Sequence, residues 1–277
     1  MEPTDIAFIG GGNMARSLIG GLLATGWPAA RIHVAEPAAA QHALLHQLDP
    51  GLQVGDDNPA AAAAAEVVVL AVKPQVLPAV ARELAAVVQA RQPLCLSIAA
   101  GVRVADLERW LGGAAPVVRA MPNTPALVQT GATGLYANPR VSEAQRARAE
   151  SLLRAVGLTV WVEDEALLDA VTALSGSGPA YFFLFMEAMQ AAGEALGLPA
   201  ESARVLSLQT ALGAAKLALE SPEPVDVLRQ RVTSPGGTTE AALAEFEAGD
   251  LRGLVARAMQ AARERARELA DQLGRDT

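Results

Sequence analysis

The segment Thr233–Thr239 combines residues that can bind an anion with residues that can supply a hydroxyl group. Two adjacent glycines lie there inside a long run of helical sequence, where each glycine costs about 1 kcal/mol relative to alanine. The sequence fits the start of a helix better, with Ser234 as the N-cap and Pro235 at the first helical position. Gly236 and Gly237 then fill the first turn, whose N–H groups lack helical partners and can bind a carboxylate or phosphate. A well-capped helix and an anion cradle with a hydroxyl donor fit these residues equally well.

A second glycine-rich segment, Gly10-Gly11-Gly12-Asn13-Met14-Ala15, directly follows the apolar run Ile6–Ile9. The pattern G-x-G-x-x-A after a strand and at the start of a helix is typical of dinucleotide binding. Gly10 allows the tight turn, Gly12 lets a pyrophosphate approach the backbone, and Ala15 keeps the helix close to the sheet. We therefore expect this loop to bind the pyrophosphate of a dinucleotide.

Two charged residues follow the next apolar runs. Glu36 ends the run Ile32–Ala35, where an acidic residue can accept a hydrogen bond from the ribose 2′-hydroxyl of NAD and would repel the 2′-phosphate of NADP. The alternative is that Pro37 turns Glu36 into solvent. Lys73 follows the run Val67–Val72, so it either lies on the ligand-binding edge of the sheet or is a solvated loop residue.

Short apolar runs alternate with helical runs over the first 160 or so residues, which indicates a doubly wound, mainly parallel sheet of the Rossmann type. The expected strands are Ile6–Ile9, Ile32–Ala35, Val67–Val72, Leu94–Ile98, Val117–Ala120, Gly131–Tyr136 and Leu158–Val162. After Glu163 the pattern is helical throughout, so we predict a dinucleotide-binding domain over 1–163 and an all-α domain over 164–277. The helix Pro179–Leu196 is apolar almost all round in its first half, which favours a subunit interface.

Composition excludes several classes of function. The net charge of −8 argues against a nucleic-acid partner, because a phosphate backbone needs a basic surface. The single cysteine, Cys95, lies in an apolar run and cannot form an intramolecular disulfide. The three histidines all lie within the first 46 residues, so a histidine general base and a metal site are not expected. No secretory signal or membrane span is visible, so we expect a cytoplasmic protein.

Five motifs together resemble the pyrroline-5-carboxylate reductase family over almost the whole chain. In order along the chain, they are Phe8–Ala15, Ala71–Gln75, Met121–Ala126, Ser175–Tyr181 and Thr233–Thr239. The resemblance implies a Rossmann domain followed by a helical domain that forms a homodimer, with a higher oligomer of dimers left open. It also implies reduction of 1-pyrroline-5-carboxylate to L-proline by NAD(P)H, the last step of proline biosynthesis.

The same resemblance assigns roles to individual residues. It implies that cofactor is bound by Gly10, Gly11, Gly12, Asn13, Met14, Asn58, Val72, Lys73, Pro74 and Ala100, with Glu36 bearing on the choice of cofactor. It implies that Ser234, Gly237 and Thr238 bind the substrate carboxylate and that Glu165 approaches the substrate across the dimer. Thr239 would place its hydroxyl by the ring nitrogen and is the expected catalytic residue. The family more often prefers NADPH, whereas Glu36 favours NADH.

Two other functions remain open at this stage. A β-hydroxyacid dehydrogenase shares the architecture and would use Lys216 as acid and base, although the asparagine that usually accompanies this lysine is missing. A dinucleotide-sensing protein without catalysis would bind cofactor and leave Thr233–Thr239 unexplained. Some relatives carry a substrate-contacting acid near the position of Pro222, and the neighbouring Glu223 is left without a role.

Overall fold

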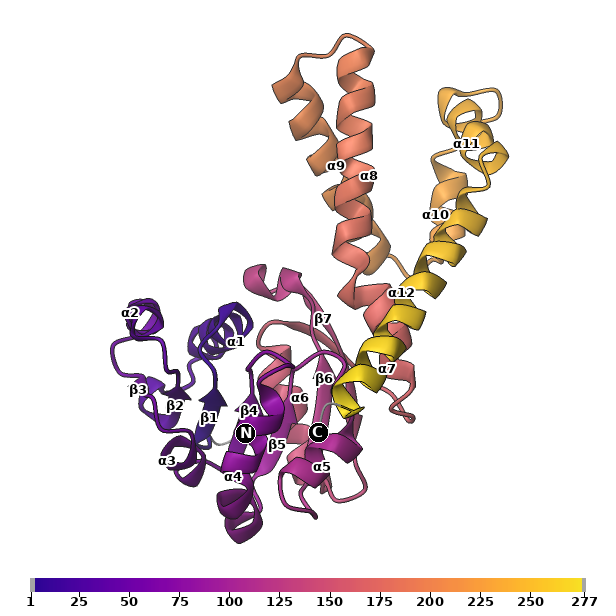
Figure 1. Ribbon diagram of the computed structural model, residues 1–277. Coiled ribbons are helices and arrows are strands. Elements are labelled where there is room, and N and C mark those ends of the chain that lie inside the picture. Colours follow the sequence, from indigo (N-terminus) through magenta and orange to yellow (C-terminus); the bar gives the residue numbers. More distant parts are fainter. Residues whose placement is uncertain (1–2, 276–277) are drawn as a thin grey trace. The chain divides into compact units, whose positions relative to one another are not determined.

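The computed structural model describes residues 3–275, and these form two compact units. One unit comprises the chain up to Ser177 together with the part from Ala262 onward, and the other comprises Gly178–Ala261. The first unit therefore contains the whole sheet and the second is entirely helical (Figure 1).

The first unit is built on one eight-stranded sheet with the spatial order β3-β2-β1-β4-β5-β6-β7-β8. Its strands are β1 Ile6–Ile9, β2 Ile32–Ala35, β3 Gln53–Gly55, β4 Val67–Leu70, β5 Leu94–Ser97, β6 Val117–Met121, β7 Gly131–Ala137 and β8 Gly157–Trp161. All neighbouring strands run parallel except β6 and β7. The strand order reverses at β1, so the carboxyl ends of β1 and β4 flank the crevice where such sheets bind ligands.

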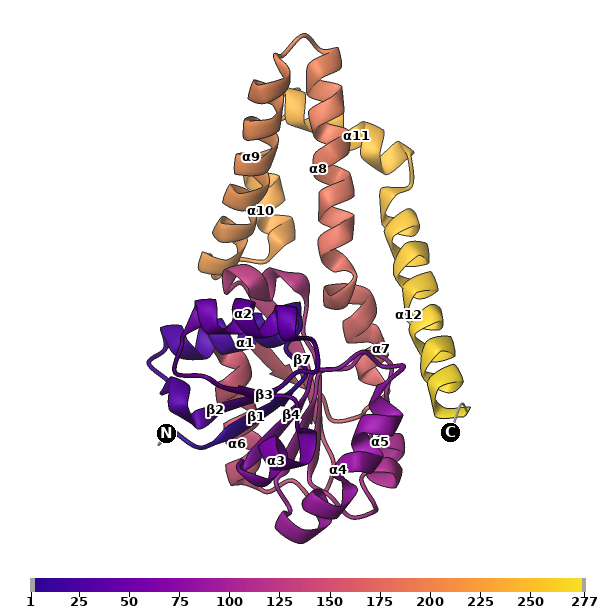
Figure 2. The same ribbon diagram turned by 60° about the vertical axis from the view of Figure 1, so that its left-hand side comes forward.

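Helices cover both faces of this sheet, as Figures 1 and 2 show. They are α1 Asn13–Ala24, α2 Ala39–Leu48, α3 Asn58–Ala63, α4 Leu77–Arg91, α5 Val104–Trp110, α6 Glu143–Arg154 and α7 Leu167–Val171, with short turns η1 Ala29–Arg31 and η2 Thr124–Val128 and a π-helix, η3, at Thr172–Gly176. One hydrophobic cluster joins the sheet to α1, α2 and α6, and a second joins it to α3, α4 and α5. All four residues of β1 and of β4 are buried, which explains why their sequences are continuously apolar. The predicted doubly wound, mainly parallel sheet is confirmed.

One strand was not predicted. β3 has only three residues, two of them exposed, and it lies at the edge of the sheet, where Val54 pairs with Val34 of β2. Such a short, polar segment carries no apolar periodicity, so only its pairing with β2 identifies it as a strand.

The second unit consists of helices that bury few large side chains. Its helices are α8 Gly178–Ala195, α9 Ala200–Glu220, α10 Val225–Arg231, α11 Thr238–Ala248 and the first part of α12 Leu251–Arg275. α8 contacts α11 through Phe185 and Phe246, whose ring centroids lie 6.0 Å apart. Phe182, Phe183 and Leu184 are 62–67% exposed in the single chain. No helix within residues 3–275 is long and apolar enough to cross a membrane.

The compact units divide the chain at different places from the predicted boundary at 163/164. That boundary marks the change of sequence type, because β8 ends at Trp161 and only helices follow. Residues 164–177 and the last turns of α12 belong instead to the unit that contains the sheet. Ala270 of α12 is buried in this unit, and Leu273 packs against the hydrophobic cluster that joins the sheet to α3, α4 and α5. A sequence pattern that distinguishes only helix from strand cannot predict this packing.

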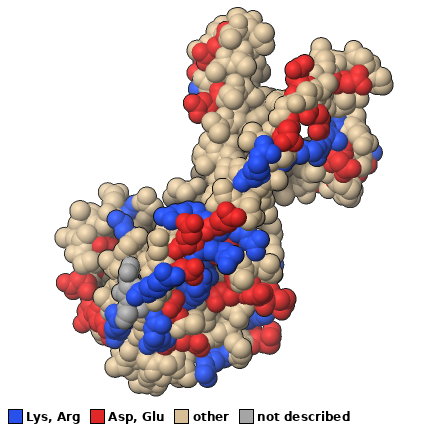
Figure 3. Space-filling model, turned by 45° about the vertical axis from the view of Figure 1, so that its right-hand side comes forward, with Lys and Arg blue, Asp and Glu red and all other residues tan. Residues whose placement is uncertain are grey.

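Charged side chains of both signs lie next to one another on the face of each unit drawn in Figure 3. Many of them form ion pairs within a single helix or between neighbouring segments, such as Arg204 with Glu201 and Arg148 with Glu66. This mixing of charges is typical of a solvated surface. The chain has 22 Lys and Arg residues against 30 Asp and Glu residues, which gives its net charge of −8.

Candidate active site

The first glycine loop has a backbone that only glycine can adopt. Gly10 has φ +101°, and its N–H donates to the carbonyl of Ala35 at 2.8 Å. A Cβ added to Gly10 would lie 2.8 Å from the carbonyl oxygen of Ala71, the residue that follows β4. The glycine therefore lets the ends of β1, β2 and β4 approach one another at the crevice.

The start of α1 is open and fits a dinucleotide pyrophosphate. Gly12 is the N-cap, with an extended backbone and no side-chain cap among the described residues, and a Cβ added there would meet no atom within 4 Å. The N–H groups of Asn13 and Met14 lie in the first turn of the helix, where N–H groups lack intrahelical partners, and the N-cap supplies no capping side chain. An anion is favoured at such a position by the free N–H groups and by the helix dipole.

Glu36 lies against the glycine loop and does not turn into solvent. One carboxylate oxygen accepts a hydrogen bond from the Gly11 N–H at 2.8 Å, and the other accepts from the Ala38 N–H at 2.9 Å. The side chain is therefore held in one place beside Gly11, at the carboxyl end of β2. The Gly11 N–H is occupied by this contact, so the N–H groups left for an anion are those further into α1.

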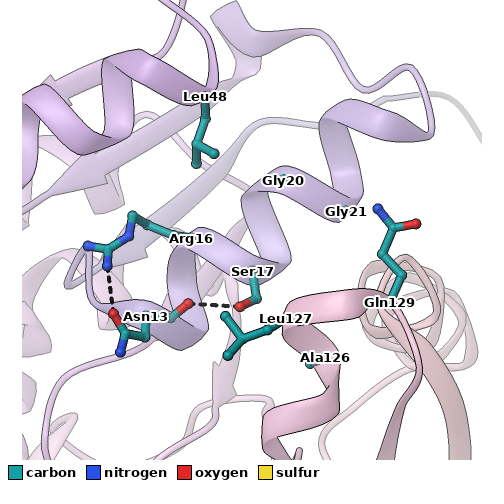
Figure 4. A pocket seen from close by; sticks show the side chains of 9 residues that line it. All are labelled: Asn13, Arg16, Ser17, Gly20, Gly21, Leu48, Ala126, Leu127 and Gln129. Carbon is teal, nitrogen blue, oxygen red and sulfur yellow. Dashed lines mark hydrogen bonds between the residues drawn. The ribbon is translucent and has the colours of Figure 1, made fainter. Parts of the chain in front are cut away.

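A shallow pocket of about 300 Å³ lies on the outer side of α1, against η2 and the end of α2 (Figure 4). Asn13 Oδ1 accepts a hydrogen bond from Arg16 Nη2 at 2.6 Å, and the Ser17 hydroxyl donates to the Asn13 carbonyl at 2.9 Å. The Asn13 side chain is thus tied to its own helix. Its backbone N–H remains the group that can contact a phosphate.

The ends of β4 and β5 bring the remaining predicted cofactor residues to the same edge of the sheet. A Cβ on Gly10 would lie 3.1 Å from the Val72 side chain, and the Lys73 carbonyl accepts from the N–H groups at the start of α4. Pro74 and Ala100 line a cavity of about 320 Å³. Asn58 begins α3 and donates to Glu83 of α4 at 2.9 Å, so its side chain is occupied by that carboxylate.

The Thr233–Thr239 segment forms a different local structure from the one predicted. Ser234 is not the N-cap: α11 begins at Thr238, and Gly237 is its N-cap. The Ser234 carbonyl accepts a hydrogen bond from the Gly237 N–H at 2.9 Å, and Gly236 has φ +70°. Pro235 and Gly236 are therefore the central residues of a β-turn with the signature of type II. These residues form this turn in place of the predicted first turn of the helix.

The start of α11 is nevertheless uncapped, as an anion cradle requires. No side chain within residues 3–275 caps its first turn, so the N–H groups of Thr238 and Thr239 remain available there. Gly237 also has a packing reason to be glycine, because a Cβ would lie 2.9 Å from the Ser234 carbonyl oxygen. The turn thus places the hydroxyl-bearing Thr238 and Thr239 at the first two positions of the helix.

Two acidic residues near this segment have partners that the sequence did not reveal: Glu240, which sequence reasoning missed, and Glu223, which it left without a role. Glu240 accepts a hydrogen bond from the Gly236 N–H at 2.6 Å, a contact that the expected helix start at Pro235 hid. Glu223 accepts from Arg231, and its second oxygen, Oε2, is buried with no partner in the part of the chain that the structure describes. Both acids were visible in the sequence, but only the folded turn brings Glu240 to its partner.

Glu165 lies in the unit that contains the sheet. Its Oε1 accepts from the Arg119 guanidinium at 3.0 Å and from the Val104 N–H at 2.8 Å. Arg119 was not singled out from the sequence, where it stands in an apolar run with no recognisable spacing. Its Glu165 partner is 46 residues away, so no local pattern could reveal the pair.

The structure gives little support to the alternative centred on Lys216. This lysine lies 3.8 Å from Glu220 on α9, with 69% of its side chain exposed in the single chain. Among the described residues, no group of three or more His, Cys, Asp and Glu side chains is arranged to hold a metal ion. His42 instead contacts the Glu36 carbonyl at 2.6 Å.

Comparisons with known proteins agree with this arrangement. The family model for pyrroline-5-carboxylate reductase dimerisation matches residues 165–269, and a model for coenzyme F420-dependent NADP oxidoreductases matches residues 5–101. The pyrroline-5-carboxylate reductase of Pseudomonas aeruginosa is 56% identical over 274 residues, which cover 99% of this chain and 100% of that protein. The chain belongs to the pyrroline-5-carboxylate reductase family.

Solved structures of pyrroline-5-carboxylate reductases have the same fold. The protein from Coxiella burnetii is 48% identical, with a TM-score of 0.94 over 97% of this chain and 99% of that chain. The Plasmodium falciparum protein, solved with NADP bound, is 28% identical, with a TM-score of 0.85 over 98% of this chain and 99% of that chain. These likenesses extend through both units, so the family covers the glycine loop and the Thr233–Thr239 segment alike.

Proposed function

We propose that this chain reduces 1-pyrroline-5-carboxylate to L-proline with NAD(P)H, as its family does. The observation that carries the proposal is the presence in one chain of two uncapped, glycine-rich helix starts, at α1 and at α11. The first fits a dinucleotide pyrophosphate and the second fits a small carboxylate with a hydroxyl group beside it. A dinucleotide sensor would use the first and leave the second without a ligand.

The cofactor side of the proposal rests on the carboxyl edge of the sheet. The N–H groups of Gly12, Asn13 and Met14 would bind the pyrophosphate, with Gly10 and Gly11 shaping the turn. Val72, Lys73 and Pro74 would line the nucleotide, together with Asn58, and Ala100 would lie near the nicotinamide. When bound, NAD(P)H supplies the hydride.

The substrate side of the proposal rests on the start of α11. The first-turn N–H groups at Thr238 and Thr239 would bind the carboxylate, assisted by Ser234, and Gly237 would keep the approach clear. The Thr239 hydroxyl would hydrogen-bond the ring nitrogen as the imine becomes an amine. A cyclic imine is readily protonated, so the reaction needs orientation more than a strong acid. Holding donor and acceptor in near-attack contact supplies about 7–11 kcal/mol.

We further propose that the active form is a homodimer assembled through the helical unit. Phe182, Phe183 and Leu184 follow one another on α8 and are 62–67% exposed in the single chain, and adjacent exposed apolar side chains mark interaction surfaces. The dimerisation model spans this helix. A higher oligomer built from such dimers is a compatible extension of the same proposal.

We propose that NADH is the preferred cofactor, although the Plasmodium falciparum relative was solved with NADP. The Glu36 carboxylate is fixed beside the glycine loop by two N–H groups, where it can accept from a 2′-hydroxyl and repels a 2′-phosphate. Replacing Glu36 with Gln keeps the length and removes the charge. We expect the ratio of kcat/KM for NADH over NADPH to fall about tenfold, equivalent to about 1.4 kcal/mol. An unchanged ratio would contradict this assignment.

One assay tests the reaction itself. Oxidation of NADH and of NADPH is followed at 340 nm with 1-pyrroline-5-carboxylate and, separately, with 3-oxo acids. Turnover with the imine alone supports the proposal. Turnover with 3-oxo acids would favour a β-hydroxyacid dehydrogenase, and binding of cofactor without turnover would favour a sensor.

A further inference from the structure

A partly buried ion pair joins Arg119 of β6 to Glu165, and Arg119 has no part in the roles proposed so far. Arg119 projects from β6 among buried apolar residues, and only 5% of its side chain is exposed. Its Nη1 lies 3.0 Å from Oε1 of Glu165, in the segment between β8 and α7. A buried guanidinium is costly unless it is paired, so this arginine needs a structural or functional reason.

The same carboxylate oxygen also holds the start of a helix. Glu165 Oε1 accepts from the N–H of Val104, the first residue of α5, at 2.8 Å. The N-cap of α5, Arg103, supplies no side-chain cap. Glu165 therefore performs this role from a distant segment, and a carboxylate at a helix N-terminus is electrostatically favoured. One oxygen atom thus links β6, the segment after β8 and α5.

The segment held in this way is the loop that leads from β5 to α5. Ala100 and Gly101 belong to it, and Gly101 has φ +76°. Ala100, Gly101 and Arg119 line the same cavity of about 320 Å³, together with Pro74 from the end of β4. Displacing Val104 would therefore move a loop that faces the proposed nicotinamide position.

The same loop has a second, exposed attachment. Arg103 pairs with Asp271 of α12 at 2.6 Å, and their side chains are 42% and 46% exposed. Exposed ion pairs are weak because water competes with them, whereas the Glu165 carboxylate is only 22% exposed and accepts two hydrogen bonds through one oxygen atom. The same loop is therefore held by a less exposed contact, from Glu165 to the Val104 N–H, and by an exposed ion pair, between Arg103 and Asp271.

We propose that Arg119 and Glu165 are positioning residues for hydride transfer. Arg119 orients Glu165, and Glu165 fixes the start of α5 so that the loop at Ala100 presents the nicotinamide at the correct distance. This inference rests on the proposed reaction and gives Glu165 a role within one chain. A misplacement of about 1 Å in such a site can reduce the rate about 100-fold.

The test uses the full-length enzyme and replaces both members of the pair, Arg119→Met with Glu165→Leu. Removing the two charges together avoids leaving one buried and unpaired. We expect kcat to fall at least tenfold and the Kd for NADPH, measured by fluorescence titration, to rise about tenfold. We expect the KM for 1-pyrroline-5-carboxylate to stay within twofold of wild type, because this proposal has the pair act on the loop at Ala100 and not on the substrate. Glu165→Gln keeps the oxygen acceptor for Val104 and Arg119, so it retains most of the activity.

The matched control is Asp271→Asn, which weakens the exposed attachment of the same loop and leaves kcat and Kd within twofold of wild type. The inference is overturned if the folded double variant keeps both parameters within twofold. It is also overturned if the KM for the imine rises as much as the Kd, since that pattern indicates direct substrate contact by Glu165. The NADPH titration needs no imine, so it decides this inference even if wild-type enzyme fails to reduce 1-pyrroline-5-carboxylate.

Discussion

The helix starts at α1 and α11 look alike in sequence but differ in what supports them. Each has a glycine N-cap and no capping side chain. α1 packs on the sheet through five buried residues, and its N-cap follows the fully buried strand β1. α11 has no buried residue in the single chain, and a β-turn precedes it.

This difference shows how the two helix starts are held in place. The cofactor loop is fixed by a core that one chain completes, because the ends of β1, β2 and β4 meet at Gly10. The proposed substrate cradle is fixed locally, by its turn and by Glu240, and α11 buries no residue in the single chain. Cofactor binding should therefore respond to changes in the core, whereas substrate binding should respond to changes in the turn.

The largest effect is expected from Gly10→Ala compared with Gly12→Ala. The first adds a Cβ 2.8 Å from the Ala71 carbonyl oxygen at φ +101°, so it should both destabilise the unit and raise the Kd for NADPH at least 100-fold. The second adds a Cβ in open space, so the melting temperature should be nearly unchanged. Gly12→Ala should still raise the Kd about tenfold by obstructing the pyrophosphate. Thermal unfolding measures the melting temperature and fluorescence titration measures the Kd for NADPH. Equal losses of stability in the two variants would contradict the different roles given to Gly10 and Gly12.

The next effect tests the chemistry of the cradle. We expect Thr239→Ala to lower kcat at least tenfold, a loss of about 1.4 kcal/mol or more, because the ring nitrogen loses its hydrogen-bond partner in the transition state. Thr239→Ser keeps a hydroxyl group and should restore most of the rate. The Kd for NADPH should stay the same in both variants. A kcat for Thr239→Ala equal to that of wild type would remove the proposed catalytic role.

A smaller effect separates substrate binding from cofactor binding. Glu240 places a carboxylate on the Gly236 N–H, next to the position proposed for the substrate carboxylate. Glu240→Gln removes that like charge, so the KM for 1-pyrroline-5-carboxylate should fall two- to threefold with kcat unchanged. Glu245→Gln makes the same change of charge further along α11 and should leave the KM alone. An unchanged or higher KM for Glu240→Gln would contradict this reading of the cradle.

The smallest effect probes the rigid core beneath the cofactor loop. Burial raises the pKa of the Cys95 thiol to about 12, so at pH 8 only about one thiol in 10⁴ is the reactive thiolate. Iodoacetamide should leave the native protein unlabelled for hours and label it in urea. Activity should be unaffected by the treatment. Rapid labelling of the native protein would mean that β5 opens readily.

Much of the fold followed from the sequence because its signals are local. The strands Ile6–Ile9 and Ile32–Ala35 were predicted with their observed bounds, and the predicted helix start after the glycine loop is the start of α1. These elements are recognised from apolar runs bounded by glycines, and such patterns involve only residues close together in the sequence. The edge strand Gln53–Gly55 was missed, because an exposed three-residue strand exists only through its pairing partner.

The sequence by itself therefore determined which candidate groups the chain offers: the pattern G-x-G-x-x-A at Gly10–Ala15, the glycines and threonines of Thr233–Thr239, and three histidines confined to the first 46 residues. Tertiary structure decided where those groups are held. It placed Glu36 on the Gly11 N–H, turned Ser234 into part of a β-turn, and joined Arg119 to Glu165 across 46 residues. The physical reason is that residue types and spacing encode local backbone preferences, whereas buried charge pairs and caps supplied from distant segments form only when the core brings those segments together.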